Sequence, residues 1–510
     1  MESASIAAGV PEGSAPGEKG LKANAIGFVS GVVIGVASTA PGYSLAASLG
    51  FVIGVAGIGT ASPAIMIVAF IPMLFIAAAY YWMNRADPDC GTTFSWVTKA
   101  MGPWAGWMGG WGIACAGTIV MANLAQIAGL YFFLLFDWQS AADSTVAVTI
   151  VGVIFIILMT WICVIGIELS ARTQVGLLGA ELITLIIFAI VALVRVYAGD
   201  AGPNAIKPEL SWFNPFEVDS LTALVDAVLI AVFIYWGWDS TVTVNEETEN
   251  SNETPGRAAL ISTVILLLIY VIVSAAAQAF DGTAALADQD DALSVVANGV
   301  LGSPLDKIVI IAVLTSSAAS CQTTILPNAR TALSMARQGA WPKKLGEVSP
   351  RYLTPHVSTI LFGVLSVVWY VGLTAISENI LADSIAALGL MIAFYYGITG
   401  FACVVYYRRE IFKSARNFFF VGLAPLIGAL MLTYLFVKSC ADLSDPANSS
   451  SGSSWLGLGP PLVIGLGFLL FGAVLMVIWR IAGHKEFFKR KLEVADPAVI
   501  ARSPAGEAGS

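Results

Sequence analysis

Long runs of apolar residues recur along this chain and limit the folds that it can adopt. The runs at Leu177–Val194 and Leu462–Trp479 are each long enough to cross about 30 Å of hydrocarbon at about 1.5 Å per helical residue. A soluble domain carries about 25% charged residues, whereas only 12% of these 510 residues are charged and 57% are hydrophobic. We therefore expect an all-α integral membrane protein.

Twelve apolar segments are separated by polar stretches or by stretches that contain Gly and Pro, such as Asp87-Pro88-Asp89 and Ser444–Ser454. Each segment predicts one transmembrane helix. The predicted spans cover residues 26–53, 62–84, 104–136, 146–166, 171–198, 220–245, 258–280, 306–336, 356–376, 380–407, 417–438 and 460–482.

Lysine and arginine are unevenly distributed over the loops between these spans. With the N-terminus inside, all but four of the 25 Lys and Arg residues fall on the inner side, and such an excess marks cytoplasmic loops. One miscounted span would exchange the sides of every later loop and remove this bias. The bias therefore supports the count, and it predicts a multi-pass protein of the plasma (inner) membrane with both termini cytoplasmic. The four outer residues are Arg195, Lys207, Lys307 and Lys438.

The two ends of the chain and its charge argue against several other classes of protein. Residues 1–24 are polar and lack the short apolar core and cleavage site of a signal peptide, so we expect a disordered cytoplasmic tail there and another at 491–510. A net charge of −9 argues against a nucleic-acid partner. The six cysteines are scattered without a C-x-x-C motif, which predicts neither a disulfide framework nor a zinc site, and we expect no cofactor.

The first predicted span contains helix-breaking residues near its middle. Pro41 removes a backbone donor and clashes with the preceding turn, and Gly42 beside it weakens the helix further. Ser38, Thr39 and Ser44 add polar groups at membrane depth. Taken alone, these residues would also fit a simple proline kink, which is common in membrane helices.

An acidic residue, Asp239, lies inside the sixth predicted span, close to Gly237. The acidic run that begins at Glu246 marks the inner end of this span and places Asp239 about two turns inside it. A carboxylate at the bilayer centre costs about 2.5–3.5 kcal/mol on insertion scales, so such residues are usually retained for a function. The alternative is that Asp239 lies at the membrane interface.

The positions of the two interruptions indicate an internal repeat. Spans 1 and 6 each open a group of five spans, and an inverted repeat of five predicts interruptions at those two places. We therefore expect a first repeat at 25–200, a second at 218–410 and two further spans at 415–485. Lipid cannot satisfy the unwound backbone groups. N–H groups at a half-helix N-terminus suit a carboxylate, and free carbonyls suit an ammonium or a cation.

Three further stretches resemble the amino acid–polyamine–organocation permease superfamily. Together they are specific, although each alone would be weak. The first is the predicted inner loop between spans 2 and 3 with the start of span 3, the second is span 6 with its exit, and the third is the exit of span 8. They read Cys90-Gly91-Thr92-Thr93-Phe94-Ser95-Trp96 with Gly102-Pro103-Trp104-Ala105-Gly106-Trp107 and Gly110-Trp111; Tyr235-Trp236-Gly237-Trp238-Asp239 with Asn245-Glu246-Glu247-Thr248 and Pro255-Gly256-Arg257-Ala258; and Ala329-Arg330-Thr331 with Ser334-Met335-Ala336-Arg337-Gln338-Gly339-Ala340-Trp341-Pro342 and Thr354-Pro355.

The resemblance covers residues 26–410, with spans 11 and 12 in the usual place of the family. It implies a five-plus-five inverted repeat with helices 1 and 6 broken, alternating access, and uptake or exchange of amino acids or related amines. It also implies carboxylate binding at the span 1 break and amine binding at span 6. Two positions depart from the family pattern: Gln338 stands where Asp is frequent, and the segment 38–42 replaces a glycine-rich break.

The candidate substrate-binding residues lie on the two interruptions and on span 3. Backbone N–H groups of the span 1 break are the expected donors, and Asp239 could titrate or pair with a cationic amine. One tryptophan of span 6 is expected to cover the substrate, with a cation–π contact to an ammonium, and packing alone is the alternative. The two polar residues of span 3 share one helix face and could line the pocket or bond between helices. The predicted set is Ala37, Ser38, Thr39, Ala40, Pro41, Gly42, Asn123, Gln126, Tyr235, Trp236, Gly237, Trp238 and Asp239.

The expected coupling ion is H⁺ or Na⁺, and no other metal is expected. In sodium-coupled relatives of this fold, hydroxyls on span 8 complete a Na⁺ site with span 1 carbonyls. Span 8 carries several hydroxyls here, although helix packing would also explain them. Span 5 has no lysine that would mimic sodium, but its Glu181 is a candidate proton site or a packed polar residue. The predicted coupling residues are Asp239, Glu181, Thr315, Ser316, Ser317 and Ser320.

These features predict a secondary active transporter rather than an enzyme, a channel or a receptor. A membrane enzyme would cluster His, Cys or acids at a bilayer face, and a channel would show repeated selectivity groups; neither pattern occurs in the sequence. We expect the substrate to be a small neutral amino acid, and a cationic amine or polyamine is the alternative that Asp239 favours. Glu246 and Arg257, at the inner exit of span 6, are placed to form a gating ion pair.

Overall fold

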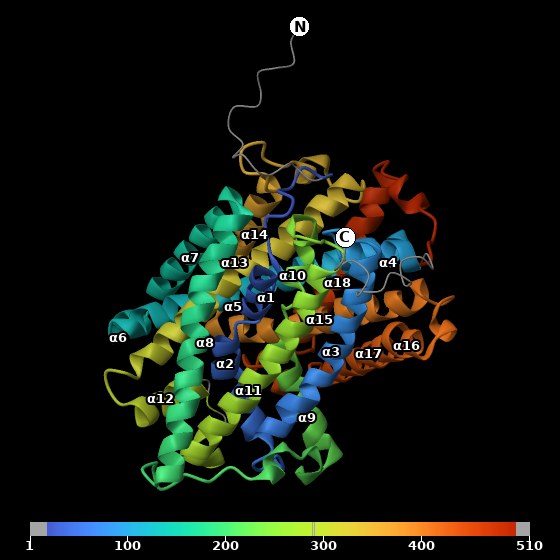
Figure 1. Ribbon diagram of the computed structural model, residues 1–510. Coiled ribbons are helices and arrows are strands. Elements are labelled where there is room, and N and C mark those ends of the chain that lie inside the picture. Colours follow the sequence, from blue (N-terminus) through green and yellow to red (C-terminus); the bar gives the residue numbers. More distant parts are fainter. Residues whose placement is uncertain (1–17, 288, 290, 496–510) are drawn as a thin grey trace.

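The computed structural model describes residues 18–287, 289 and 291–495 of the protein (Figure 1). Within these residues, twelve helices are long and apolar enough to cross a membrane, which confirms the predicted number of spans. In chain order, the spans are α1 with α2 (Phe28–Ser38 and Pro41–Gly54), α3 (Ser62–Ala86), α5 (Pro103–Leu135), α7 (Thr145–Ile165), α8 (Ile167–Ala198), α9 with α10 (Leu221–Val232 and Ser240–Thr243), α11 (Thr254–Leu286), α13 (Lys307–Arg337), α14 (His356–Ile376), α15 (Glu378–Tyr406), α16 with α17 (Ala415–Asn417 and Ala424–Asp442) and α18 (Pro460–Ile481).

Shorter helices connect the spans, and no strand occurs in the described parts of the chain. Figure 1 shows α4 at the same end of the bundle as the described residues before α1 and after α18. We call this the terminal end, and we call the end that carries α12 the opposite end. The short elements are α4 (Thr93–Met101), α6 (Gln139–Ala142), α12 (Ala292–Leu301), a π-helical turn at Phe418–Leu423, and 3₁₀ turns at Leu210–Phe213, Pro215–Glu217, Phe233–Tyr235, Asn245–Glu247, Lys343–Gly346, Ile411–Lys413, Pro446–Asn448 and Phe487–Lys489.

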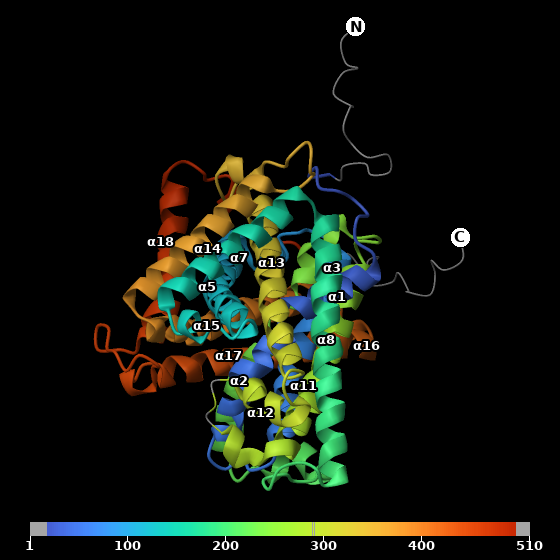
Figure 2. The ribbon, with the colours of Figure 1, turned by 90° about the vertical axis from the view of Figure 1, so that its left-hand side faces the viewer.

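The spans divide into buried and lipid-facing helices. Spans 1, 2, 8 and 10 are largely buried, whereas only about a third of the residues of α7, α14 and α18 are buried. The exposed side chains of α7 include Ile150, Ile154 and Ile157, and an apolar outer face is what lipid requires. Figure 2 shows α8 and α18 on opposite sides of the bundle, with the interrupted span 1 closer to α8.

Local sequence explains where several helices begin. The Ser220 hydroxyl accepts a hydrogen bond from the Ala223 N–H (3.1 Å) at the start of α9. Prolines occupy the first turn of α2, α3, α5 and α18, where the missing N–H removes no helical hydrogen bond. Gly102 makes the turn between α4 and α5 with a φ of 103°, a conformation that a side chain would resist.

Span 1 is interrupted between α1 and α2, where the sequence predicts it. Ala40 adopts a left-handed conformation, with φ 47° and ψ 64°, and α2 begins at Pro41. Proline cannot donate to the preceding turn and disfavours helix at the residue before it, which explains the position of the break. A left-handed alanine costs about 1–2 kcal/mol, so the surrounding packing has to stabilise this conformation.

Span 6 is interrupted between α9 and α10. A 3₁₀ turn ends at Tyr235, Trp236 is extended, and Gly237 has a φ of 116°. The Ser38 and Ser240 hydroxyl oxygens lie 2.7 Å apart, so the two interruptions are in direct contact. Each group of five spans thus opens with a broken helix, and the predicted fold of twelve spans with a five-plus-five repeat is confirmed.

Parts of both predicted tails pack against the bundle. Residues 1–17 and 496–510 lie outside the described residues. Leu21 is buried. The N–H groups of Ala25 and Ile26 both donate to the Glu247 carbonyl (2.7 and 3.0 Å). At the other end of the chain, the Glu493 N–H donates to the Lys99 carbonyl (2.8 Å). Residues 18–24 and 491–495, which the sequence assigns to tails, therefore belong to the terminal end of the fold.

Candidate functional site

The Asp239 carboxylate lies beside the contact between the two interruptions. It directly precedes α10 and is only 2% exposed. Its two oxygens accept hydrogen bonds from the hydroxyls of Tyr395 (3.2 Å) and Tyr396 (2.8 Å) on α15. None of the salt bridges among the described residues includes Asp239. A buried carboxylate without a counter-ion is costly, which makes Asp239 a functional candidate.

A small cavity adjoins Asp239. Its volume is about 10 Å³, which is enough for about one water molecule. Trp236 closes one side of it, where the indole N–H donates to the Tyr395 hydroxyl. An organic solute is much larger than this space, so this conformation is closed and the cavity must expand to bind one. The lining residues are Ser38, Ile113, Gly117, Trp236, Asp239, Ser240, Thr324, Pro327, Asn328 and Tyr395.

Several lining residues were not predicted from the sequence. Thr324 and Asn328 stand one helical turn apart on span 8, so they share one face of that helix. Asn328 donates weakly to the Ala114 carbonyl (3.4 Å), and its Oδ1 has no partner among the described residues. A buried amide within a membrane span is a signal that could have identified Asn328. Ser240 carries no such signal, because single serines are common in membrane helices.

Tyr235 and Trp238, two predicted residues of span 6, face away from the cavity. The Tyr235 hydroxyl donates to the Met66 carbonyl (2.9 Å). Trp238 is fully buried between Tyr80 and Tyr396, with ring centroids 5.1 and 5.2 Å away. Trp236 therefore lines the cavity, and Trp238 packs in the core.

The two predicted residues of span 3 form bonds between helices. The Asn123 amide donates to the Ser384 hydroxyl on α15 (3.1 Å). The Gln126 side-chain carbonyl accepts a hydrogen bond from the Tyr370 hydroxyl on α14 (2.6 Å). Neither residue is among those that line the cavity beside Asp239. Their placement agrees with the alternative of interhelical bonding.

The N–H groups in the first turn of α2 already have acceptors within the protein. Pro41 has no N–H group. The Gly42 N–H donates to the Glu181 carboxylate on α8 (2.6 Å), and the Tyr43 N–H donates to the Ser316 hydroxyl on α13 (3.2 Å). The Ser44 N–H donates to the carbonyl of residue 40 (2.8 Å). These expected donors for a substrate carboxylate are therefore not free in this conformation.

The polar groups at the end of α1 are also engaged. The Ser320 hydroxyl on α13 donates to the Ser38 carbonyl (3.0 Å), and the Thr39 hydroxyl donates to the carbonyl of residue 36 (2.7 Å).

Ser317 is buried, and its hydroxyl has no partner within the described part of the chain. The Thr315 hydroxyl bonds to carbonyls of its own helix. Among the four predicted hydroxyls of span 8, Ser316 and Ser320 thus contact span 1. Ala37, the remaining predicted residue of the break, is fully buried.

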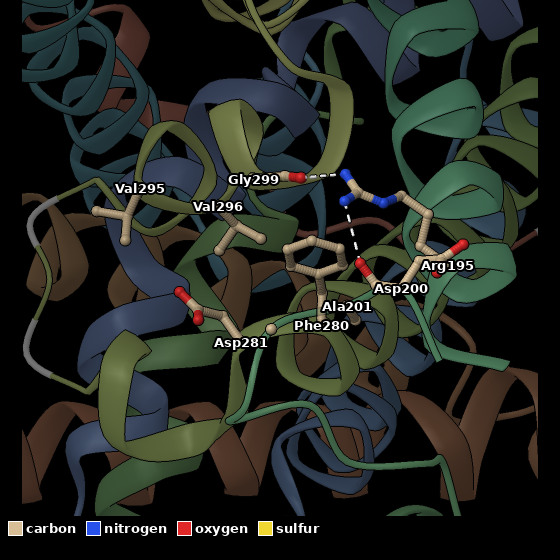
Figure 3. Close-up of a pocket in the computed structure, with 9 residues that line it drawn as sticks. Arg195, Asp200, Ala201, Phe280, Asp281, Val295, Val296 and Gly299 are labelled. Carbon is tan, nitrogen blue, oxygen red and sulfur yellow. Dashed lines mark hydrogen bonds between the residues drawn. The ribbon is translucent and has the colours of Figure 1, made fainter. Parts of the chain in front are cut away.

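A roomier pocket of about 340 Å³ lies at the opposite end of the bundle, between α8, α11 and α12 (Figure 3). Arg195 donates there to the Gly299 carbonyl and to the Asp200 carbonyl (3.1 Å). Its guanidinium carbon lies 5.3 Å from the centroid of the Phe280 ring. These contacts tie the end of α8 to α12. The pocket includes neither interruption, so the smaller cavity beside Asp239 is the better candidate site.

A group of polar side chains closes the terminal end. The Lys19 ammonium lies 2.8 Å from Asp89 Oδ2 and 2.6 Å from Glu246 Oε1. Asp89 Oδ1 accepts hydrogen bonds from the hydroxyls of Ser95 (2.7 Å) and Ser334 (2.6 Å). We call these five residues the latch cluster. Its members Ser95, Glu246 and Ser334 come from the three stretches that carry the family resemblance, so the structure brings those stretches together.

The latch cluster is an ion-pair network rather than a metal centre. Asp89, Cys90 and Glu246 lie close enough together to hold a metal ion, but the Lys19 ammonium sits among them, 3.7 Å from the Cys90 sulfur. Burial alone would raise the pKa of Asp89, but the Lys19 ammonium and the hydroxyl donors lower it to about 2. Burial alone would lower the pKa of Lys19, but its acidic neighbours raise it above the usual value. Both groups therefore stay charged at neutral pH.

A second ion pair is fully buried next to the latch cluster. The Arg330 guanidinium contacts both oxygens of Glu247, at 2.6 and 3.0 Å, and the two side chains are 1% and 0% exposed. This two-point geometry is the strongest form of such a contact. The predicted pair between Glu246 and Arg257 is wrong, because Glu246 binds Lys19 and Arg257 lies 3.5 Å from Glu253, the N-cap residue of its helix. The nearer partner is available one turn away on the same helix face.

A comparison with known families shows to which family this chain belongs. A sequence profile described as amino acid permease matches residues 23–479, which include both interruptions and all of the latch cluster except Lys19. The chain belongs to the amino acid permease family. Its members are transporters, so the permease is a membrane transport protein and not an enzyme.

Individual relatives of the permease are distant and differ in what they carry. It is 21% identical over 373 residues to the low-affinity putrescine importer PlaP of Escherichia coli, across 72% of this chain and 79% of the relative. It is 23% identical over 332 residues to the branched-chain amino acid permease BcaP of Bacillus subtilis, across 62% and 69%. An arginine/ornithine antiporter of Lactococcus lactis subsp. cremoris is 21% identical over 310 residues, across 57% and 61%. Family membership therefore leaves the substrate open.

Replacement of Gly237 by Ala is expected to impair the permease. A Cβ atom at this position would lie 2.8 Å from the Ser38 carbonyl carbon, and the φ of 116° disfavours any side chain. We expect a loss of stability of about 1–3 kcal/mol and a large loss of uptake, because the break of span 6 could not keep its shape. Thermal unfolding in detergent and uptake by proteoliposomes measure the two effects.

A matched control for this substitution is Gly179→Ala on α8. A Cβ atom there would meet no atom within 4 Å, and the backbone is helical. Alanine should therefore be tolerated or mildly stabilising at this position. Equal behaviour of the two variants would contradict a special role for the conformation of Gly237.

Replacement of Lys19 by Ala is expected to open the terminal end of the permease more often. Burial and the nearby Glu246 carboxylate raise the pKa of the Cys90 thiol more than the Lys19 ammonium lowers it, so this thiol reacts slowly while the latch cluster is closed. Loss of contacts to two carboxylates should raise the labelling rate of Cys90 by a polar thiol reagent about tenfold or more, since a hydrogen bond to a charged group contributes about 1.5–3 kcal/mol. Mass spectrometry of the labelled protein in a Cys440→Ala background measures this rate.

The control is Lys343→Ala, which removes an exposed lysine from the same end. The folded-state pKa of Asp89 is lowered from 3.8 to about 2. The contact between Lys19 and Asp89 therefore stabilises the closed latch cluster at neutral pH, and this stabilisation is lost only as the pH falls through that range. Labelling should therefore stay slow in the wild-type permease under mildly acidic conditions. A labelling rate that does not change in the Lys19 variant would show that the latch cluster does not gate access to Cys90.

Proposed function

We propose that the permease is a secondary active transporter that carries a small amino acid or amine across the plasma membrane by alternating access. The observation that carries this proposal is the contact between two interrupted helices at Ser38 and Ser240, beside the buried Asp239 carboxylate. Interrupted helices occur in membranes where their backbone groups line a binding cavity. The cavity here is too small for a substrate, so binding requires the surrounding spans to move.

Both interruptions supply hinges for this movement. Ala40 and Gly237 have positive φ angles, and the backbone hydrogen bonds of each preceding half-helix end at the N–H groups of Ala40 and Trp236. The latch cluster joins the residues before span 1 to the exits of spans 6 and 8. In the proposed orientation, with both termini cytoplasmic, release of the latch cluster opens the cytoplasmic side.

Transport is proposed to be coupled to H⁺ or Na⁺. The Ser38 carbonyl and the Ser320 hydroxyl meet at the end of α1, and the Ser317 hydroxyl lacks a partner among the described residues. These oxygen atoms are of the type that binds Na⁺ in broken-helix transporters. Glu181 supports the alternative of H⁺ coupling, because it is fully buried and forms none of the salt bridges of the described chain.

Uptake and counterflow in proteoliposomes of purified permease test this proposal. We expect saturable uptake of a labelled amino acid or amine, accelerated by unlabelled substrate inside the vesicles. A channel would equilibrate the label without counterflow, and a receptor would bind without transport, so either result would refute the proposal. Replacement of Na⁺ by choline, and collapse of the pH gradient, separate the two coupling ions.

Import or exchange of a cationic amine is the second candidate function. Asp239 favours it, because the cavity contains a carboxylate and none of its lining residues is basic. The similarity to a putrescine importer is compatible with it. The same vesicles, tested with labelled diamines, decide between the two substrates.

A further inference from the structure

The protein places a carboxylate of its own where a substrate carboxylate would bind. Glu181 Oε1 accepts the Gly42 N–H at 2.6 Å, which is shorter than the usual distance of about 2.9–3.0 Å. The start of a half-helix attracts a negative group through its free N–H groups and its dipole. Glu181 supplies that group here, Ser316 takes the next N–H, and Pro41 offers none.

Glu181 has little freedom to leave this position. It is fully buried within α8, which continues without interruption on both sides of it. Its second oxygen, Oε2, is also buried and has no hydrogen-bond partner among the described residues. A ligand carboxylate that displaced Glu181 from Gly42 would leave two negative groups side by side in a site of low dielectric, which is strongly unfavourable.

The charges around the two interruptions lack a positive counterpart. Asp239 and Glu181 are both buried, and neither takes part in a salt bridge within the part of the chain that the structure describes. A zwitterionic amino acid would add a third carboxylate to this region. An amine would add only the missing positive charge, and the Trp236 ring beside the cavity suits an ammonium.

We infer that Glu181 takes the place of a substrate carboxylate, and that the permease therefore selects primary amines or diamines without a carboxylate over the corresponding amino acids. This inference rests on the proposed transport function and narrows its substrate class. Occupation of the Gly42 N–H does not depend on the protonation state of Glu181, because a protonated carboxyl group also accepts this N–H through its carbonyl oxygen. Repulsion between the two carboxylates adds to the exclusion when Glu181 is ionised. Asp239 is the expected partner of the ammonium.

Ligand pairs that differ only by a carboxylate test the inference on the wild-type permease. Suitable pairs are putrescine and ornithine, cadaverine and lysine, and isoamylamine and leucine. Thermal stabilisation of the purified protein over a ligand titration gives the affinities. We expect at least one amine to bind about a hundredfold more tightly than its amino acid, since like charges placed together in a buried site cost several kcal/mol.

Two outcomes separate a failure of the inference from a failure of the proposed function. An amino acid that binds as tightly as its amine, or more tightly, would overturn the inference and leave the transport function standing. If no member of any pair were bound or taken up by proteoliposomes, the proposed function itself would fail.

Two substitutions separate the hydrogen bond of Glu181 from its charge. Glu181→Gln keeps an oxygen that accepts the Gly42 N–H, so amino acids should remain excluded. Glu181→Ala frees this N–H, and the affinity for amino acids should rise about tenfold or more relative to the amines, because one hydrogen bond to a carboxylate becomes possible. Glu168→Gln, on the half-exposed first turn of the same helix, should change neither affinity.

An unchanged ratio of amine to amino acid affinity in the Glu181→Ala variant would overturn the inference. If this variant did not fold, the comparison of wild type with Glu181→Gln would decide, because a loss of amine selectivity in the Gln variant would show that charge alone, and not occupation of the Gly42 N–H, excludes amino acids.

Discussion

Replacement of Asp239 by Asn is expected to abolish uptake and to weaken amine binding by about a hundredfold or more. The ammonium of the bound amine would lose its carboxylate partner, and removal of one member of such a buried charge pair costs about 2–5 kcal/mol. The carboxylate is 2% exposed and adjoins the cavity between the two interruptions. Asparagine keeps the size of the side chain and removes its charge. The hydroxyls of Tyr395 and Tyr396 can rotate to suit an amide, so we expect the variant to fold.

Uptake by proteoliposomes and thermal stabilisation by ligands measure both effects on one preparation. Asp226→Asn is the control on the same span, because Asp226 is 40% exposed and lies 3.6 Å from Lys438, away from the cavity. Uptake by the Asp239 variant at the wild-type rate and with wild-type pH dependence would exclude this residue from both substrate binding and coupling.

Replacement of Arg330 by Ala is expected to destabilise the permease by about 3–5 kcal/mol, because it leaves the buried Glu247 carboxylate without its partner. The side chains of Arg330 and Glu247 are 1% and 0% exposed, and two hydrogen bonds join them. Burial raises the pKa of Glu247 even with Arg330 present, so loss of the guanidinium should further favour protonation of this carboxylate. The loss of stability is measured as a fall in the unfolding temperature in detergent.

Two controls show whether the buried charge causes this effect. The double variant Arg330→Met with Glu247→Leu removes both charges, and it should recover most of the lost stability, since apolar residues of similar volume often replace a buried ion pair without cost. Arg257→Ala removes a half-exposed guanidinium and should change stability by only about 0–1 kcal/mol. A single variant as stable as the wild type would contradict the assigned role of the pair.

The membrane architecture could be predicted because each of its elements depends on a local pattern. Span 2 begins at residue 62 in both the prediction and the structure, and span 9 runs from residue 356 to 376 in both. Apolar run length sets these spans, whatever their neighbours are. The break before Pro41 was predictable for the same reason, since a missing N–H and a restricted preceding residue act within one turn of helix.

The candidate site was only partly predictable. The sequence pointed to the region around Asp239, but it could not show that Trp236 faces the cavity and that Trp238 packs against Tyr80. Asn123 and Gln126 do share one side of span 3, as their spacing predicts, yet that side meets α14 and α15. Helical spacing shows which residues lie on a common face, and the packing of the bundle determines what that face contacts.

By itself, the sequence determined that this protein crosses the membrane twelve times, that spans 1 and 6 are broken, and that an acid lies beside the second break. These properties follow from hydrophobicity, from the missing donor of proline and from the freedom of glycine, which act over a few residues. Only the tertiary structure decided which groups meet at the breaks. Glu181 reaches Gly42 across 139 residues, and Lys19 reaches Glu246 across 227. Such contacts depend on how separate helices pack in space, and no local pattern in the chain specifies them.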